Sequence, residues 1–183
     1  MCIEPDQRRR SAPLRVSAKT FEWRAALVVA IVVVVLDQWS KAAITSTLSY
    51  GQSVPITSFF NLVLVYNRGA AFSFLSAASG WQREFFIVIT FAALALIVWM
   101  VRRHPTERLF CWGLAWVAGG AVGNLIDRVR YGHVIDFLDF HWAGWHFWAF
   151  NLADSAITLG AALLIVDSFR PRPPAPASPK LPS

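Results

Sequence analysis

The sequence contains few charged residues and almost no cysteine. Only 15% of its 183 residues are Asp, Glu, Lys or Arg, whereas 56% are hydrophobic, a balance too apolar for an ordinary soluble domain of this length. Its two cysteines, Cys2 and Cys111, lie in a polar leader and in an apolar run, so no disulfide framework, zinc-binding spacing or cysteine nucleophile motif is indicated. The composition therefore predicts an integral membrane protein.

The net charge of +6 does not indicate nucleic-acid binding, because the basic residues are not grouped with aromatic residues on one face. Most of the 17 Lys and Arg residues lie in the leader, in a short turn at 102–108 and in the tail, at the ends of apolar runs. By the positive-inside rule, both termini are predicted to be cytoplasmic and the polar motifs to face the extracytoplasmic side.

Four apolar runs, with their flanks, have the length of membrane-spanning helices. The first run is as short as the core of a signal peptide, but no small-residue cleavage site follows it, so a retained helix is expected. In the third run, the four-residue spacing of Gly119 and Gly123 predicts close packing against another helix. The helices are predicted at about residues 24–44, 84–102, 109–127 and 147–167.

Residues 45–82 show a different pattern, with glycines and a proline between short runs of β-branched and aromatic residues such as FFNLVLVY. This pattern predicts a small β-rich extramembrane region. Residues 1–23 and the proline-rich 169–183 are expected to be disordered cytoplasmic tails. The predicted fold is thus a mainly α membrane protein, a single domain of four transmembrane helices over residues 24–168 with a small extracytoplasmic β-rich subdomain.

Two aspartates at the edges of the last apolar runs are candidates for chemistry. If the fourth helix begins near Phe147, Asp154 lies about 10 Å below its outer end, with Asn151 on the same face. Asp136 lies in the preceding connection, residues 127–146, which is able to fold back toward Asp154. Two adjacent carboxylates do not both ionise readily, so one holds a proton while the other activates a water, as in an aspartic protease.

Simpler interpretations of these residues remain open. Asp154 would cap the helix if the helix began later, or it would pair with Arg128. Asp139 competes with Asp136 as a partner for Asp154, and spacing does not exclude it. Asp37 and Lys41 are four residues apart on one helix face, which predicts either an ion pair alone or a supporting role in a site.

Two other classes of protein also remain open. Intramembrane carboxylates often mark ion paths, which would indicate a small transporter, but the scarcity of polar residues through the bilayer depth favours a surface site. A non-catalytic scaffold held together by the glycine face is the second alternative.

His133, His141 and His146 lack the spacing of a helical ligand pair, so neither a metal nor another cofactor is predicted.

Five blocks of the sequence together resemble the bacterial lipoprotein signal peptidases, or signal peptidase II, in the same order as in that family. The resemblance covers approximately residues 24–168. It implies an integral membrane aspartic endopeptidase of the bacterial inner membrane, active on the periplasmic side, which removes the signal peptide from prolipoproteins by cutting before a diacylglyceryl-modified cysteine. The blocks are LDQWSK (36–41), NRGAAFSFL (67–75), GGAVGNLIDR (119–128), VIDF (134–137) and FNLADSAITLG (150–160).

By position in these blocks, the resemblance implies that Asp136 and Asp154 are the catalytic pair, which selects Asp136 over Asp139. It also implies a small extramembrane β-cradle, a prolipoprotein substrate and membrane lipid as partners, a monomer, no cofactor and inhibition by the cyclic peptide globomycin. The residues that it implies as supporting or substrate-contacting are Asp37, Lys41, Asn67, Gly69, Asn124, Asp127, Arg128 and Asn151.

Overall fold

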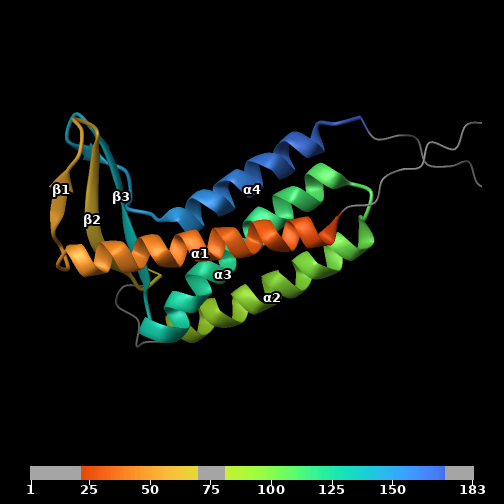
Figure 1. Ribbon diagram of the computed structural model, residues 1–183, viewed down its shortest axis with the longest axis horizontal. Helices are drawn as coiled ribbons and strands as arrows, with labels where there is room; N and C mark the ends of the chain where they lie inside the picture. The colour runs from red at the N-terminus through yellow and green to blue at the C-terminus, as the bar shows by residue number, and fades with distance from the viewer. Residues whose placement is uncertain (1–21, 70–80, 172–183) are drawn as a thin grey trace, which may run out of the picture.

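A computed structural model describes residues 22–69 and 81–171 (Figure 1). Most of both predicted disordered tails lies outside the described residues. The described chain forms α1 (Trp23–Thr47), β1 (Ser53–Pro55), β2 (Phe60–Asn67), α2 (Gln82–Arg103), α3 (Arg108–Tyr131), β3 (Val134–Trp142), β4 (Trp145–His146) and α4 (Leu152–Ser168).

Three of these helices, α1, α2 and α3, are between 22 and 25 residues long and apolar enough to cross a membrane. The fourth, α4, has 17 residues and is not among the candidate spans found in the described part of the chain. The predicted combination of a mainly helical membrane protein with a small sheet is therefore confirmed. The prediction of a fourth span rests on the sequence.

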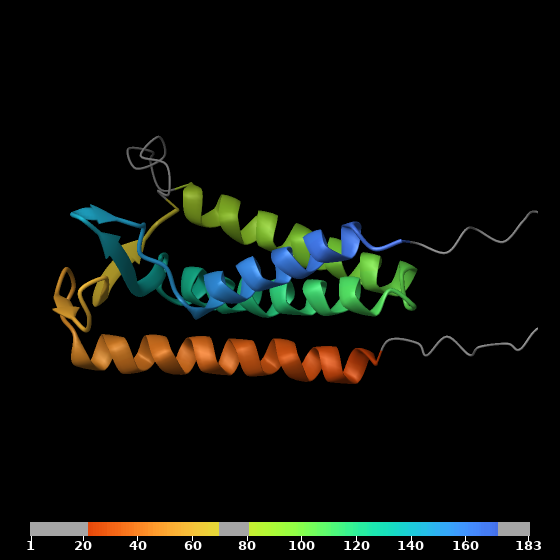
Figure 2. The ribbon, with the colours of Figure 1, turned by 90° about the horizontal axis from the view of Figure 1, so that it is seen from above.

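The helices are arranged around α3, against which α1, α2 and α4 all pack (Figures 1 and 2). The prediction that Gly119 and Gly123 permit close helix packing is confirmed. A Cβ atom at Gly119 would lie 2.9 Å from Cβ of Val33 on α1, and one at Gly113 would lie 2.9 Å from the carbonyl oxygen of Gly160 on α4. Only glycine allows the backbones to approach this closely.

The sheet lies across one end of the helix bundle (Figure 1). Its four strands are antiparallel in the order β1-β2-β3-β4, and β2 pairs with β3 from Phe60↔Phe140 to Asn67↔Val134. Leu48, Leu64 and Ile135 form a small hydrophobic core between the end of α1 and the sheet. This core fixes β3 relative to the helix ends, where the polar residues lie.

The segment between the third and fourth helices is not the connection predicted over residues 127–146. Instead, α3 continues to Tyr131, and Gly132 ends it with a φ of +78°, a left-handed conformation that glycine adopts without steric penalty. The chain then runs directly into β3. As a result, Asp136 lies on a paired strand and not on a loop.

The start of the fourth helix also differs from the prediction at Phe147. Phe150 is extended, because its backbone N–H and carbonyl pair with Leu138 of β3 at 3.1 and 2.8 Å. Asn151 then caps the helix, which begins at Leu152. The predicted position of Asp154 two turns inside the helix is therefore wrong: Asp154 lies in the first turn of α4.

Candidate active site

Asn151 and Asp154 form the N-terminal cap of α4. The side-chain oxygen of Asn151 accepts a hydrogen bond from the backbone N–H of Asp154 at 2.9 Å, and Oδ2 of Asp154 accepts one from the backbone N–H of Asn151 at 3.3 Å. This reciprocal capping box satisfies N–H groups that a helix start leaves unpaired. The alternative interpretation of Asp154 as a helix cap is thus confirmed, and the cap also fixes the direction of its carboxylate.

Asp136 is buried on β3 and accepts hydrogen bonds from two side-chain amides. Asn151 Nδ2 donates to Oδ1 at 2.6 Å, and Asn67 Nδ2 on β2 donates to Oδ2 at 3.0 Å. Burial and the nearby charge of Asp154 raise the pKa of Asp136 to about 7, although the two amide hydrogen bonds act in the opposite direction. Asp136 is therefore partly protonated at neutral pH.

Asn124 on α3 connects the two carboxylates through Asn151. Its Nδ2 donates to Oδ1 of Asp154 at 2.8 Å, and its Oδ1 accepts from Nδ2 of Asn151 at 3.2 Å. Lys41 donates to the same oxygen at 3.0 Å. Because an ammonium group only donates, this contact fixes which end of the Asn124 amide faces Asp154. Lys41, Asn67, Asn124 and Asn151 therefore form, with Asp136 and Asp154, one continuous hydrogen-bond network.

Lys41 also forms ion pairs with a second pair of acids. Its Nζ lies 2.8 Å from Oδ2 of Asp37 on the same helix and 2.8 Å from Oδ2 of Asp127 on α3. All three side chains are nearly inaccessible, with relative exposures of 3% or less. The predicted pairing of Asp37 with Lys41 is confirmed, and Asp127 completes the group. Buried charges of this kind persist when they are paired and hydrogen-bonded.

Asp37 and Asp127 hold the backbone next to the other two aspartates. Oδ1 of Asp37 accepts from the backbone N–H of Ala153 at 3.0 Å, one residue before Asp154. Oδ2 of Asp127 accepts from the backbone N–H of Ile135 at 3.2 Å, one residue before Asp136. Through these backbone contacts, Asp37 fixes the position of Asp154, and Asp127 fixes the position of Asp136.

Gln38 belongs to this group but was not singled out from the sequence. Its Nε2 donates to Oδ1 of Asp127 at 2.8 Å, to the carbonyl oxygen of Gly123 at 3.2 Å and to Oδ2 of Asp37 at 3.3 Å. The sequence feature that could have identified Gln38 is its position next to Asp37 in the LDQWSK block. Gly123 makes room for the group, since a Cβ atom there would lie 2.6 Å from Oδ2 of Asp37.

Gly69 and Arg128 lie at the border of the site. The backbone N–H of Gly69 donates to Oδ1 of Asn67 at 2.8 Å, which directs the NH₂ group of Asn67 toward Asp136. Gly69 has a φ of +96°, and a Cβ atom there would clash with the ring of Phe86. The guanidinium of Arg128 lies 5.0 Å from the centre of that ring, and its Nη1 donates to the carbonyl oxygen of Asn124 at 3.3 Å.

Asp139, the competing partner, does not join this network. It accepts from Nδ2 of Asn61 at 2.8 Å and pairs with Nδ1 of His146 at 3.0 Å, and His146 stacks on His141. Burial alone would raise the pKa of Asp139, but the hydrogen bonds from Asn61 and His146 outweigh it and lower the pKa. In residues 22–69 and 81–171, no group of three or more His, Cys, Asp or Glu side chains is arranged to hold a metal ion.

Asp136 and Asp154 thus differ from the other acids of the site in having amide partners only. Within the described residues, no Lys, Arg or His nitrogen lies within 4 Å of either carboxylate. Asp136 is 2% exposed, whereas Asp154 is partly exposed. Two carboxylates held by one amide network, one of them with a pKa near neutrality, can activate a water and protonate a carbonyl oxygen.

Comparisons of the sequence and of the structure with known proteins agree with each other. The sequence profile of signal peptidase (SPase) II matches residues 29–170. The lipoprotein signal peptidase of Burkholderia vietnamiensis (strain G4 / LMG 22486) is 61% identical over 142 residues, 78% of this chain and 86% of that protein. The lipoprotein signal peptidase of Janthinobacterium sp. (strain Marseille) is 58% identical over 142 residues, with the same coverage of 78% and 86%. A solved bacterial membrane enzyme has a TM-score of 0.75 at 30% identity, with 84% of this chain and 97% of that chain covered.

Proposed function

The chain belongs to the signal peptidase II family, and from this membership we propose that Asp136 and Asp154 are the catalytic pair that hydrolyses the signal peptide bond. The protein is a membrane protease that removes the signal peptide from prolipoproteins. Membership also sets aside the transporter and scaffold alternatives. The observation that supports the pair most strongly is its shared network: Asn151 bonds to both carboxylates, at 2.6 Å to Asp136 and at 3.3 Å to Asp154.

The different environments of the two acids suggest their roles. Buried Asp136, whose pKa is raised to about 7, holds a proton and gives it to the carbonyl oxygen of the scissile peptide bond. Partly exposed Asp154 accepts a proton from the attacking water. The resulting hydroxide adds to the carbonyl carbon and gives a tetrahedral intermediate with two hydroxyl groups. This intermediate collapses when Asp154 returns its proton to the leaving nitrogen while Asp136 takes a proton back from one hydroxyl group, so the C–N bond breaks and both acids regain their starting states. The cleavage requires no metal and no other cofactor.

The surrounding residues divide into two groups in this proposal. Asn67, Asn124 and Asn151 orient the two carboxylates through direct hydrogen bonds. Asp37 and Asp127, held by Lys41, position the backbone next to the two carboxylates, at Ala153 and Ile135. Arg128, which is half-buried over the Phe86 ring, is placed to contact a carbonyl group of the substrate, and Gly69 sets the direction of Asn67. These roles are proposals drawn from the contacts.

We extend the proposal to the placement of the protein in the membrane. α1, α2 and α3 span the bilayer, and α4 with its flanking residues is the fourth span. The excess of Lys and Arg in the leader, the 102–108 turn and the tail supports a cytoplasmic location for the helix ends opposite the sheet. The catalytic pair then faces the periplasmic side of the inner membrane. We also propose that the protein acts as a monomer.

The proposed substrate is a prolipoprotein with a diacylglyceryl-modified cysteine, cut on the amino side of that cysteine. Each buried methylene of its acyl chains contributes about 0.8 kcal/mol, so the lipid keeps the scissile bond near the headgroup region. Asp154, in the first turn of α4 at the sheet end of the bundle, lies where such a bond would arrive.

A gel-shift cleavage assay tests this proposal. Wild type and Asp154→Asn, purified in detergent, receive a prolipoprotein in its diacylglyceryl-modified and unmodified forms. We expect the wild type to cleave only the modified form and the folded variant to cleave neither. Equal cleavage of both forms would contradict the proposed substrate, and cleavage by Asp154→Asn would contradict the proposed pair.

A further inference from the structure

An apolar groove lies at the opposite end of the bundle from the catalytic pair, between α1, α2 and α3. Its volume is about 580 Å³, within the roughly 300–1,000 Å³ of typical ligand sites. The groove is lined by residues of α1, α2 and α3, and both α1 and α2 pack against α3. Cys111, Ala115 and Ala118 of α3 are the small side chains of its floor. The thiol of Cys111 already donates to the carbonyl oxygen of His104 at 3.2 Å, so it offers a ligand no free donor.

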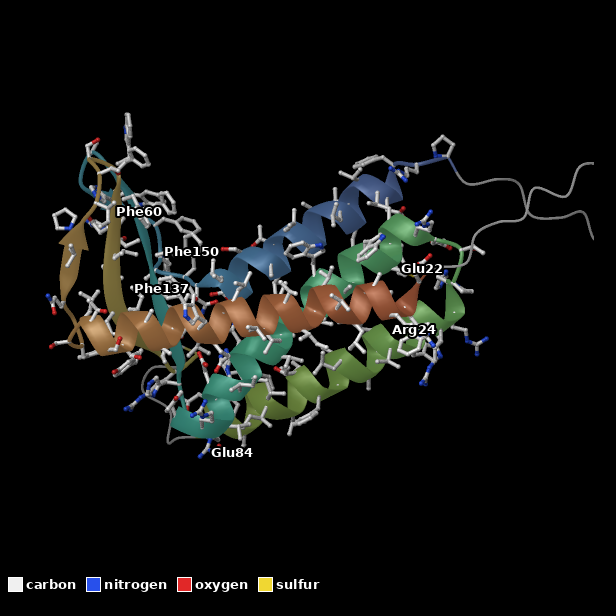
Figure 3. All side chains as sticks on the ribbon, in the orientation of Figure 1. Glu22, Arg24, Phe60, Glu84, Phe137 and Phe150 are labelled. Atoms are coloured by element: carbon white, nitrogen blue, oxygen red, sulfur yellow. The ribbon has the colours of Figure 1, made fainter. Side chains whose placement is uncertain are left out.

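The mouth of this groove is basic. Arg102 is the charged residue of its lining. Arg103 and Arg24 lie nearby, each with its guanidinium 5.7 Å from the centre of an indole ring, and Figure 3 shows Arg24 at this end of the bundle. The acidic residues at this end are Glu22, Asp167 and Glu107, and Glu107 pairs with His104 at 2.8 Å. The groove therefore combines an apolar interior with a positively charged entrance.

We propose that this inner groove binds an anionic glycerophospholipid, with an acyl chain between α1 and α2 and the phosphate at Arg102. Basic pockets between transmembrane helices on the cytoplasmic side are typical sites for anionic headgroups. A guanidinium group matches a phosphate with two parallel hydrogen bonds. The bound chain fills the space that α1 and α2 leave open, so it holds α1 in position from the end opposite the catalytic pair. This inference does not depend on the proposed catalytic residues.

Charge argues against the other occupants of such a groove. A second copy of this chain would bring the same arginines to the mouth, and the chain's own leader carries Arg8, Arg9 and Arg10. A signal peptide has a positively charged amino-terminal region, which the same arginines would repel. A spanning helix about 30 Å long and 10 Å wide also occupies roughly 2,400 Å³, far more than the groove provides.

Native mass spectrometry of the full chain tests the proposal. Wild type, Arg102→Gln, Ala118→Phe and Arg108→Gln are purified in neutral detergent and titrated with phosphatidylglycerol or phosphatidylcholine. Arg108 is the matched control, an exposed arginine at the same end of the bundle but outside the groove. We expect one tightly bound phosphatidylglycerol, about fivefold weaker binding in Arg102→Gln, loss of that lipid in Ala118→Phe, and no change in Arg108→Gln.

Thermal unfolding of the same samples gives a second readout, because a ligand that binds the folded state raises the melting temperature. Phosphatidylglycerol should stabilise the wild type and Arg108→Gln but not Ala118→Phe. Three results would overturn the proposal: equal binding of phosphatidylcholine, which indicates ordinary boundary lipid; an equal effect of both arginine variants, which indicates surface charge alone; or displacement of the lipid by a signal peptide, which assigns the groove to substrate.

Discussion

Two pairs of aspartates lie side by side at the junction of the helices and the sheet, and they differ in their partners. Asp37 and Asp127 share the ammonium group of Lys41 at 2.8 Å, whereas Asp136 and Asp154 bond only to amides. The two acids bound to Lys41 serve as structural anchors. Buried Asp136, with no cation within 4 Å among the described residues, has a pKa raised to about 7 and can exchange a proton, which is the property that acid–base catalysis needs.

The comparison also shows why both pairs are needed. Asp37 and Asp127, which share Lys41, accept hydrogen bonds from the backbone N–H groups of Ala153 and Ile135, the residues directly before Asp154 and Asp136. Catalytic carboxylates must be held in place without being neutralised, because a direct ion pair would remove the raised pKa. The chain meets this requirement for the proposed catalytic pair, because Lys41 binds Asp37 and Asp127 and not Asp136 or Asp154.

The largest expected effect comes from replacing one of the two acids that have no bound cation in the described part of the chain, Asp136 and Asp154, which we call the uncompensated pair. Asp136→Asn keeps the shape of the side chain and removes its proton exchange, so we expect cleavage to fall at least about 100-fold. Asp139→Asn is the matched control on the same strand, since Asp139 bonds to Asn61 and His146 instead. Cleavage by both variants is measured after their folding is checked by thermal unfolding. Equal activity of the two would remove the distinction between the pairs.

A second effect should appear in stability. Lys41→Met leaves Asp37 and Asp127 buried without their cation, and breaking a buried ion pair from one side costs about 3–5 kcal/mol. Arg130→Met removes an exposed cation near the same helix end and should change the free energy of unfolding by less than about 1 kcal/mol. Both are measured by unfolding in mixed detergent micelles. An unchanged stability of Lys41→Met would show that the group is not a structural anchor.

A smaller effect is expected in the pH dependence of cleavage. Because Asp136 gives up its proton as the pH rises through about 7, kcat/KM of the wild type should fall above that pH. The hydrogen bond from Asn67 stabilises the ionised form, so Asn67→Ala should raise the pKa of Asp136 and move the decline to higher pH. Asn61→Ala removes an equivalent bond to Asp139 and should leave the decline in place. A shift in both variants, or in neither, would contradict this assignment.

The sequence predicted the helices well because their signal is local. Long apolar runs mark α1, α2 and α3 without reference to the rest of the chain. The sequence does not reveal where α4 starts. Residues 147–150 are apolar, and an apolar run of this kind fits a helix as well as an extended segment. What makes Phe150 extended is its pairing with Leu138, a contact between separate elements that periodicity does not reveal.

The candidate site shows the same division between local and distant contacts. The i, i+4 spacing predicted the pairing of Asp37 with Lys41, but not the third partner Asp127, which comes from another helix. Spacing alone does not exclude Asp139, because the sequence predicts a connection here and the structure has the strand β3. On β3, residues three apart face opposite sides, which separates Asp139 from Asp136.

The most direct test is infrared spectroscopy of the protonated carboxyl group as a function of pH, with Asp136→Asn as the reference that identifies the Asp136 band. We expect the band of the wild type to persist until about pH 7 and, in Asp154→Asn, to disappear at lower pH, because the neighbouring charge is gone. A band already lost at pH 5 in the wild type would contradict the view that the uncompensated pair holds the catalytic proton.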